Sequence, residues 1–281
     1  MIAPVVDADF LEASLHAGRP VVLADVRWYL DGRDGHAAYA AAHLPGALWV
    51  DLHHDLAGHD LPATAGRHPL PTPAEFAAAM SALGIGDDTV VVAYDDTGGV
   101  TAGRLVVMLR MLGSDAALLN GGLTAWIADG GEIETGPGRT PTAVPFTAAP
   151  WPIRRLASAD DTVAHAAAGG AVLDARAAER FTGAVTMIDP RPGHIPGARN
   201  APCAAVLGTD GRFLPTAELL AHYERLGATT DPAPVAYCGS GVSACMNVLA
   251  MEHVGLTPPR LYVASFSGWS ADAEREVHTG D

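Results

Sequence analysis

The sequence predicts an α/β protein made of two similar domains, each a mostly parallel sheet flanked by helices. Short β-branched runs alternate with helical patterns along the chain, and this alternation is typical of parallel sheets. Several motifs occur twice, once in each half, which indicates the duplication of a whole domain. Residues 131–152 are rich in Gly, Pro and Thr and lack sustained periodicity, so we expect a linker at residues 136–155, between domains at 1–135 and 156–281.

The expected elements follow the same order in both halves. Each half has a strand ending in Asp-x-Arg, a helix that stops before a glycine, and a second hydrophobic strand. The strands are expected at residues 21–27, 89–94, 171–176 and 234–237, and the helices at residues 74–83 and 216–226. A Pro-Gly motif and a tryptophan also recur, at His43-Leu-Pro-Gly-Ala47 and His194-Ile-Pro-Gly-Ala198, and at Trp126 and Trp269.

Cys238 stands between an expected strand and an expected helix and is followed by Gly-Ser-Gly-Val-Ser243. Glycines let such a loop curl until several backbone N–H groups point at one place, where the next helix also presents its positive dipole end. Both effects favour a thiolate, so we predict that Cys238 is a nucleophile, although a lone cysteine is more often buried and inert. The helix that follows, with Val248, Leu249 and Met251 at helical spacing, is expected to be amphipathic.

The first half has no cysteine at the corresponding place. Aligning Gly99-Val-Thr-Ala102 with Gly241-Val-Ser-Ala244 puts Asp96 opposite Cys238. The first half is therefore expected to keep the scaffold without the nucleophile, and the second half to carry the chemistry.

Composition and charge exclude several functional classes. The chain has 281 residues, of which 49% are hydrophobic and 17% charged, as in a globular enzyme and unlike a disordered protein. The net charge is -15 and every basic residue is an arginine, so we expect neither nucleic acid nor an anionic membrane as a partner. The sequence offers neither an apolar run of about twenty residues nor a signal-peptide pattern.

The cysteines indicate a reducing compartment. Cys203, Cys238 and Cys245 are odd in number and have no C-x-x-C spacing, so we expect a cytoplasmic protein without a disulfide framework. No cofactor is expected. A metal site is not expected either, because the histidines and acid at residues 53–60 have no fixed ligand spacing.

These motifs together resemble the rhodanese, or sulfurtransferase, family in its tandem two-domain form. The resemblance covers nearly the whole chain and includes the closing Ser265-Phe-Ser-Gly-Trp269. The loop at Cys238 is more similar to the Cys-Gly-Ser-Gly-Val-Thr of mercaptopyruvate sulfurtransferases than to the Cys-Arg-Lys-Gly-Val-Thr of thiosulfate-type members. The resemblance implies that the cysteine takes a sulfane sulfur as a persulfide. It then passes this sulfur to cyanide, a small thiol or a protein thiol such as thioredoxin.

The resemblance also implies roles for further residues. Arg180 matches the position that binds the donor carboxylate, Ser240 the serine that assists the donor thiol or the leaving enolate, and His68 a histidine of proton transfer. The alternatives are a solvated arginine, a loop serine and an exposed loop histidine. From the loop itself we expect the substrate sulfur to be held by backbone amides, at Gly239, Gly241, Val242 and Ser243.

Two positions depart from the family pattern. The family has a carboxylate in the segment matching residues 46–53, where this chain keeps Asp51 but has His53 at the second position, so a Cys–His–Asp relay stays open. Arg191 is left unassigned because its spacing to His194 is shorter than in family members.

The sequence therefore predicts a sulfurtransferase whose donor is 3-mercaptopyruvate, with thiosulfate as the alternative donor. A cysteine phosphatase is disfavoured, because its Cys-x5-Arg loop would need an arginine where Ala244 stands. A non-enzymatic persulfide carrier is the remaining alternative.

Overall fold

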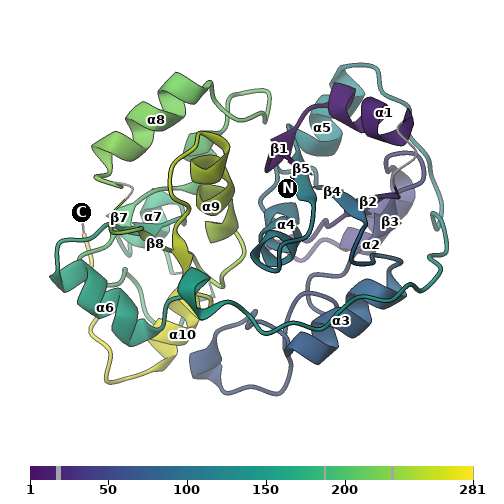
Figure 1. The fold of residues 1–281 in the computed structure, drawn as a ribbon. Coiled ribbons are helices and arrows are strands. Elements are labelled where there is room, and N and C mark those ends of the chain that lie inside the picture. Colours follow the sequence, from purple (N-terminus) through teal and green to yellow (C-terminus); the bar gives the residue numbers. More distant parts are fainter. Residues whose placement is uncertain (17–19, 187, 229–230, 281) are drawn as a thin grey trace. The chain divides into compact units, whose positions relative to one another are not determined.

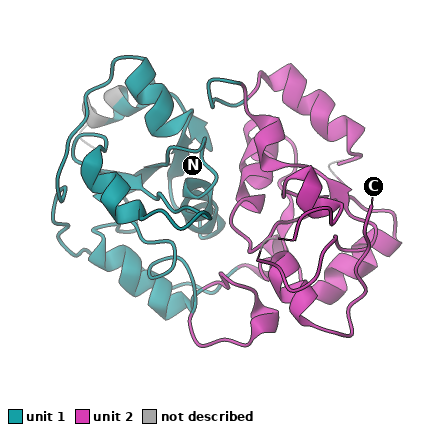
Figure 2. Cartoon of the chain, turned by 180° about the vertical axis from the view of Figure 1, so that it is seen from behind, with its two compact units in different colours: residues 1–58, 71–151, 209–213 teal, residues 59–70, 152–208, 214–281 magenta. Residues whose placement is uncertain are grey.

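The structure is a computed structural model that describes residues 1–16, 20–186, 188–228 and 231–280. The described chain divides into two compact units (Figure 2). Unit 1 comprises residues 1–58, 71–151 and 209–213, and unit 2 comprises residues 59–70, 152–208 and 214–281. Each unit thus contains a short segment from the other half of the sequence. Residues 136–155, proposed as the linker, hold a single short 3-10 helix, η2 (Ile153–Arg155).

Unit 1 is a parallel sheet with helices (Figure 1), in the strand order β1-β5-β4-β2-β3. The strands are β1 (Val5–Val6), β2 (Val21–Asp25), β3 (Leu48–Trp49), β4 (Val90–Tyr94) and β5 (Ala116–Leu119). The helices are α1 (Ala8–His16), α2 (Gly35–Ala41), α3 (Pro73–Ala82), α4 (Ala102–Met111) and α5 (Gly122–Ala128). Every residue of β4 is buried, as expected for a parallel strand covered on both faces.

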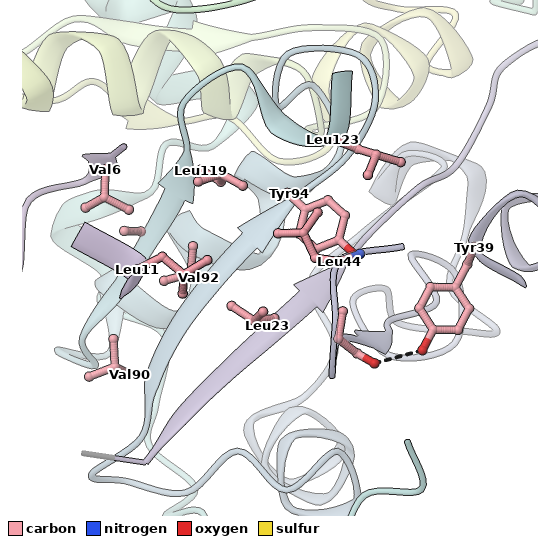
Figure 3. Packing of buried hydrophobic residues seen from close by; sticks show 12 residues of the cluster. Val6, Leu11, Leu23, Tyr39, Leu44, Val90, Val92, Tyr94, Leu119 and Leu123 are labelled. Atoms are coloured by element: carbon pink, nitrogen blue, oxygen red, sulfur yellow. Dashed lines mark hydrogen bonds between the residues drawn. The ribbon is translucent and has the colours of Figure 1, made fainter. Parts of the chain in front are cut away.

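The core of unit 1 combines aliphatic packing with two hydrogen-bonded tyrosines (Figure 3). Leu23 of β2 and Val92 of β4 belong to the buried cluster. The hydroxyl of Tyr39 donates to the carbonyl of Ala47 at 2.8 Å. The hydroxyl of Tyr94 accepts the N–H of Leu44 at 2.9 Å, so each buried phenol has a partner.

Unit 2 repeats the architecture with one strand fewer, in the order β7-β6-β8-β9, which corresponds to β3-β2-β4-β5 of unit 1. Its strands are β6 (Val172–Asp174), β7 (Arg199–Asn200), β8 (Val235–Tyr237) and β9 (Arg260–Leu261). Its helices are α6 (Ala159–Ala167), α7 (Ala178–Phe181), α8 (Thr216–Arg225), α9 (Ala244–His253) and α10 (Ser265–Ala271), with 3-10 helices η1 (Ala63–Ala65) and η3 (Cys203–Val206). The predicted fold class, two α/β domains with parallel sheets, is confirmed.

The repeated Asp-x-Arg motifs form the same buried ion pair in both units. Arg27 donates to both carboxylate oxygens of Asp25, with Nη2 at 2.7 Å. Arg176 pairs with Asp174 in the same way, with Nη2 at 2.5 Å. Because a buried charge needs a partner, each pair fixes the chain just beyond the end of its strand.

The sequence predicts the helix boundaries better than it predicts which helix faces are buried. Helix α3 begins at a capping box formed by Thr72 and Glu75, and α8 begins at the predicted Thr216. Helix α9, expected to be amphipathic, is instead buried at each position from Ala244 to Met251, so that prediction is wrong. The reason is that α9 packs against β8, β9, α8 and η3 at once. No helix among the described residues is long and apolar enough to cross a membrane.

Asp95, rather than Asp96, takes the place of Cys238 in unit 1. Strand register aligns the preceding tyrosines, because Tyr94 pairs with Asp25 as Tyr237 pairs with Asp174. The loop that follows is one residue longer in unit 1, which the motif alignment did not reveal. The Asp95 carboxylate accepts six hydrogen bonds, from the N–H groups of Thr97, Gly99, Thr101 and Ala102 and from the two threonine hydroxyls. The loop of unit 1 is therefore folded around the carboxylate of Asp95.

We predict that Asp95→Ala lowers the free energy of unfolding by about 3 kcal/mol or more, because several buried N–H groups lose their acceptor together. Urea denaturation followed by circular dichroism measures the change. The control is Asp96→Ala, which removes a single acceptor, the partner of the Tyr29 hydroxyl, and should cost about 1 kcal/mol. Equal losses in the two variants would contradict this interpretation.

Candidate active site

Cys238 lies directly after β8, in the loop that leads into α9, and its side chain is 1% exposed. Its Sγ accepts the N–H of Gly241 at 3.1 Å. Gly241 has φ 76°, a left-handed conformation that glycine adopts without strain. The loop ends at Ser243, and α9 begins at Ala244. The sulfur therefore sits beside a helix N-terminus, where negative charge is favoured.

The other loop residues contribute mainly through their backbone. Gly239 and Gly241 lie on either side of Ser240, and Val242 is buried. The carbonyls of Val242 and Ser243 accept N–H groups from the first turn of α9, at 3.0 and 3.1 Å. Of the predicted sulfur-binding amides, Gly241 makes the contact to Sγ, and the roles of the other three remain proposals.

Helix α10 anchors the backbone of the loop that begins at Cys238. The N–H of Cys238 donates to the hydroxyl of Ser265 at 3.1 Å. The carbonyls of Cys238 and Gly239 accept the N–H groups of Phe266 and Ser267, each at 2.9 Å. Ser265 has φ 52°, a conformation that costs a non-glycine residue about 1 to 2 kcal/mol. The closing motif of the sequence thus fixes the backbone at Cys238.

The segment 59–70 supplies two side chains to this loop. It packs so closely on α10 that a Cβ on Gly66 would lie 2.4 Å from the carbonyl oxygen of Ala264. A Cβ on Gly268 would lie 2.5 Å from the carbonyl oxygen of Thr64, so neither glycine tolerates a side chain. The N–H of Arg67 then donates to the hydroxyl of Ser267 at 3.1 Å, which fixes the entry of the segment into the site.

His68 and Ser240, both predicted as site residues, lie together. The His68 Nδ1 and the Ser240 Oγ are 2.8 Å apart, and both side chains are buried. Which atom donates depends on the imidazole tautomer. His68 is therefore not an exposed loop histidine, and Ser240, within the loop that follows Cys238, has an imidazole as its partner.

Arg180 and Arg67 meet on one carboxylate, that of Asp189. Arg180, on α7, pairs with Oδ2, and the Arg67 Nη1 pairs with Oδ1 at 2.7 Å. A Cβ built on Gly239 would lie 2.9 Å from the Arg67 Nη2 and 3.0 Å from the Arg180 Nη2. The two guanidinium groups thus lie against the residue that follows Cys238.

Charges of both signs meet at this cluster. Burial alone would raise the pKa of Asp189, but hydrogen bonds from Arg67 and Arg180, together with their charges, lower it below its ordinary value. Asp189 is therefore ionised at neutral pH. Arg176 adds a third cation, 3.5 Å from Asp189, but its own partner is Asp174.

Arg67 and Asp189 were missed by sequence reasoning. Arg67 directly precedes His68, so its place in that motif was an available signal. Asp189 lies in a turn outside any repeated motif, and only the fold brings it between two arginines. A single buried acid of this kind leaves no pattern in one sequence.

Arg191 and the Asp51 segment have partners of their own. The Arg191 guanidinium donates to backbone carbonyls between Trp269 and Arg275, at 2.7 to 3.3 Å, so it stabilises the end of α10. Asp51 and His53 belong to unit 1. There Asp51 accepts the N–H of His53 at 2.8 Å, and the His53 Nε2 accepts from the indole of Trp28 at 2.8 Å.

The two other cysteines are thiols of different character. Cys203, half-buried at the start of η3, has a pKa raised to about 11, by burial first and by the nearby Cys238 second. Cys245 is fully buried in α9, and its thiol lies 3.5 Å from the carbonyl oxygen of Gly241. Neither makes a disulfide.

Comparison with known proteins places the chain in one family. The rhodanese-like domain matches residues 7–129 and 158–272. A probable 3-mercaptopyruvate sulfurtransferase of Pseudomonas aeruginosa is 42% identical over 289 residues, covering 99% of each chain. A putative thiosulfate sulfurtransferase of Mycobacterium tuberculosis is 41% identical over 278 residues, covering 98% of this chain and 97% of the relative. The structure of 3-mercaptopyruvate sulfurtransferase from Leishmania major has a TM-score of 0.83 at 33% identity, covering 96% of this chain and 74% of that one.

The chain therefore belongs to the rhodanese-like family, with one such domain in each half. The family predicted from the motifs is confirmed, and the relatives bear the names of sulfurtransferases, as expected for an enzyme that moves sulfur from a donor to an acceptor. Their names include both candidate donors at nearly equal identity, so the choice between donors rests on the site.

We predict that Cys203 in the native protein resists alkylation near neutral pH. The thiolate is the reactive form, and with a pKa of about 11 only roughly one thiol in a thousand is ionised at pH 8. Iodoacetamide labelling, read by peptide mass spectrometry, should be about 100-fold slower than in the urea-unfolded protein and should rise about tenfold per pH unit up to pH 11. Equal labelling of native and unfolded protein at pH 8 would show that the thiol is not perturbed.

Proposed function

We propose that the protein transfers sulfur from 3-mercaptopyruvate to a thiophilic acceptor through a persulfide on Cys238. The observation that carries this proposal is the position of the cations. The loop from Cys238 to Ala244 contains no basic side chain, whereas the guanidinium groups of Arg67 and Arg180 lie beside it, at Gly239. The positive charge therefore comes from outside the loop, on one side of it, and the loop itself contributes none.

This arrangement suits a donor whose charge and sulfur are at opposite ends. In 3-mercaptopyruvate the carboxylate is separated from the thiol by two carbon atoms. The carboxylate binds Arg67 and Arg180, for which the planar guanidinium is the matching group. The thiol then points at Cys238. Thiosulfate carries its charge on the group bonded directly to the transferred sulfur, so it gains most from cations inside the loop.

In the first half-reaction the Cys238 thiolate attacks the donor sulfur. A sulfur–sulfur bond forms, the carbon–sulfur bond breaks, and its electron pair leaves as the enolate of pyruvate. The proton of the donor thiol must move to the enolate carbon. The hydrogen-bonded Ser240 and His68 are the pair proposed to carry it, since their side chains are joined at 2.8 Å near the loop. The negative charge left on the persulfide is stabilised by the N–H of Gly241 and the start of α9.

In the second half-reaction an acceptor nucleophile attacks the outer sulfur and releases Cys238 as the thiolate. Cyanide, a small thiol or a protein thiol such as thioredoxin completes the cycle, which gives ping-pong kinetics. The proposal includes a cytoplasmic location, where thiol acceptors are kept reduced. Thiosulfate is the second candidate donor, supported by the name of the Mycobacterium tuberculosis relative.

We predict that 3-mercaptopyruvate without acceptor adds one sulfur atom (about 32 Da) to the protein, located on the peptide that contains Cys238. Intact-mass and peptide mass spectrometry measure the gain, and dithiothreitol should remove it. Cys238→Ser should gain nothing, while Cys245→Ala keeps the gain as the matched cysteine control. A wild-type protein that gains no sulfur from this donor or from thiosulfate would rule out the proposed function. A persulfide that forms but never turns over would instead indicate a carrier.

We further predict that Ser240→Ala and His68→Gln lower kcat/KM for 3-mercaptopyruvate by about 100-fold, the usual effect of losing a proton-transfer group. Turnover of thiosulfate should fall less than tenfold, because sulfite leaves without needing a proton. The matched control is Ser270→Ala, which removes a buried serine hydroxyl bonded to the Phe266 carbonyl and should leave the ratio of donors unchanged. Equal losses for both donors would show that the pair acts on structure and not on the proton.

A further inference from the structure

Asp189 occupies an unusual place for an acid, since it lies where an anionic donor is proposed to bind. Its side chain is 5% exposed and is shared between the two arginines of the site, Arg67 on Oδ1 and Arg180 on Oδ2. The carboxylate is ionised, so it does two things at once. It fixes the positions of both guanidinium groups, and it removes one unit of positive charge from them.

The local charge can be counted from the ion pairs. Asp174 and Arg176 neutralise each other at the end of β6. Arg67 and Arg180 contribute two positive charges and Asp189 one negative charge, so the cluster beside Gly239 carries a net charge of about +1 at neutral pH. The Arg180 Nε is buried and has no hydrogen-bond partner among the described residues, which leaves a donor of this cluster for a ligand.

We propose that Asp189 is a specificity-determining residue that makes the site select monoanionic donors over dianionic ones. This inference rests on the proposed function and deepens it. A cluster of charge +1 is matched by one carboxylate, and the buried acid repels a second negative charge. The same acid holds Arg67 and Arg180 side by side, so that a single carboxylate can reach both.

The selectivity follows from the scaling of Coulomb energy with charge. A ligand of charge −2 loses twice as much to a fixed negative charge as a ligand of charge −1 at the same place. Removing the charge of Asp189 therefore favours thiosulfate, a dianion, more than 3-mercaptopyruvate, a monoanion when its thiol is protonated. Loosening of the arginines affects both donors together, so the ratio of their kcat/KM values isolates the effect of charge.

The test compares both donors in wild type, Asp189→Asn and Asp189→Glu at low and high salt. Asp189→Asn should raise the ratio of kcat/KM for thiosulfate to that for 3-mercaptopyruvate about tenfold, and this gain should shrink as salt screens the charge. Asp189→Glu keeps the charge and should keep the wild-type ratio within about threefold. The matched control is Glu179→Gln, which removes the same charge from an exposed side chain next to Arg180 and should leave the ratio unchanged.

An unchanged or lower ratio in a folded Asp189→Asn protein overturns the inference while leaving the proposed function intact, since wild-type turnover is measured in the same experiment. If Asp189→Asn does not fold, the wild type supplies the test through protection of Cys238 from alkylation. At equal ionic strength pyruvate should protect at lower concentration than sulfate, and stronger protection by sulfate overturns the inference. If the wild-type protein turns over neither donor, the result contradicts the proposed function itself.

Discussion

Both units depend on one interaction, a side-chain acceptor that binds backbone N–H groups between a parallel strand and the helix that follows it. In unit 1 this acceptor is the Asp95 carboxylate, which accepts N–H groups of its own loop. In unit 2 the corresponding atom is the Cys238 sulfur, which takes one such N–H, from Gly241. The Asp95 carboxylate uses its acceptor positions for hydrogen bonds within its own loop, so they are not available to a substrate. A sulfur held by fewer bonds keeps its lone pairs for a substrate.

The loop at Cys238 is fixed less by its own N–H groups than the loop at Asp95. Hydrogen bonds from α10 fix it in addition. In both units this helix donates an N–H to the carbonyl of the key residue, from Leu123 to Asp95 and from Phe266 to Cys238. The difference lies one residue earlier, in a left-handed position occupied by glycine in unit 1 and by Ser265 in unit 2. Ser265 accepts the backbone strain of a non-glycine residue there, and its hydroxyl takes the N–H of Cys238. The strain at Ser265 is thus offset by a hydrogen bond to Cys238 that the glycine of unit 1, which has no side chain, cannot make.

The sequence was sufficient for features that local patterns encode, namely the α/β class, the duplication, the helix ends at α3 and α8, and the position of Cys238 in a glycine-rich loop between a strand and a helix. It failed where the answer depends on packing between distant segments. The burial of α9 on all sides follows from its neighbours and not from its own residues. Strand register shows that Asp95, and not Asp96, corresponds to Cys238. Motif alignment could not show this, because it does not detect a one-residue insertion in a loop. The role of Asp189 could not be predicted, because it depends on Arg67 and Arg180, which only the fold brings next to it.

Unit 2, which contains Cys238, is also not contiguous in the sequence, and the proposed function gives this a chemical reason. Residues 156–281 contain Cys238, Ser240 and Arg180, but His68 and Arg67 come from the segment 59–70, which packs on α10 through Gly66 and Gly268. A loop without cations can stabilise a sulfur anion, but it cannot by itself bind a donor carboxylate or move a proton. Those two tasks need side chains aimed at the loop from outside. The segment from the first half supplies one of each, a guanidinium and an imidazole, on consecutive residues.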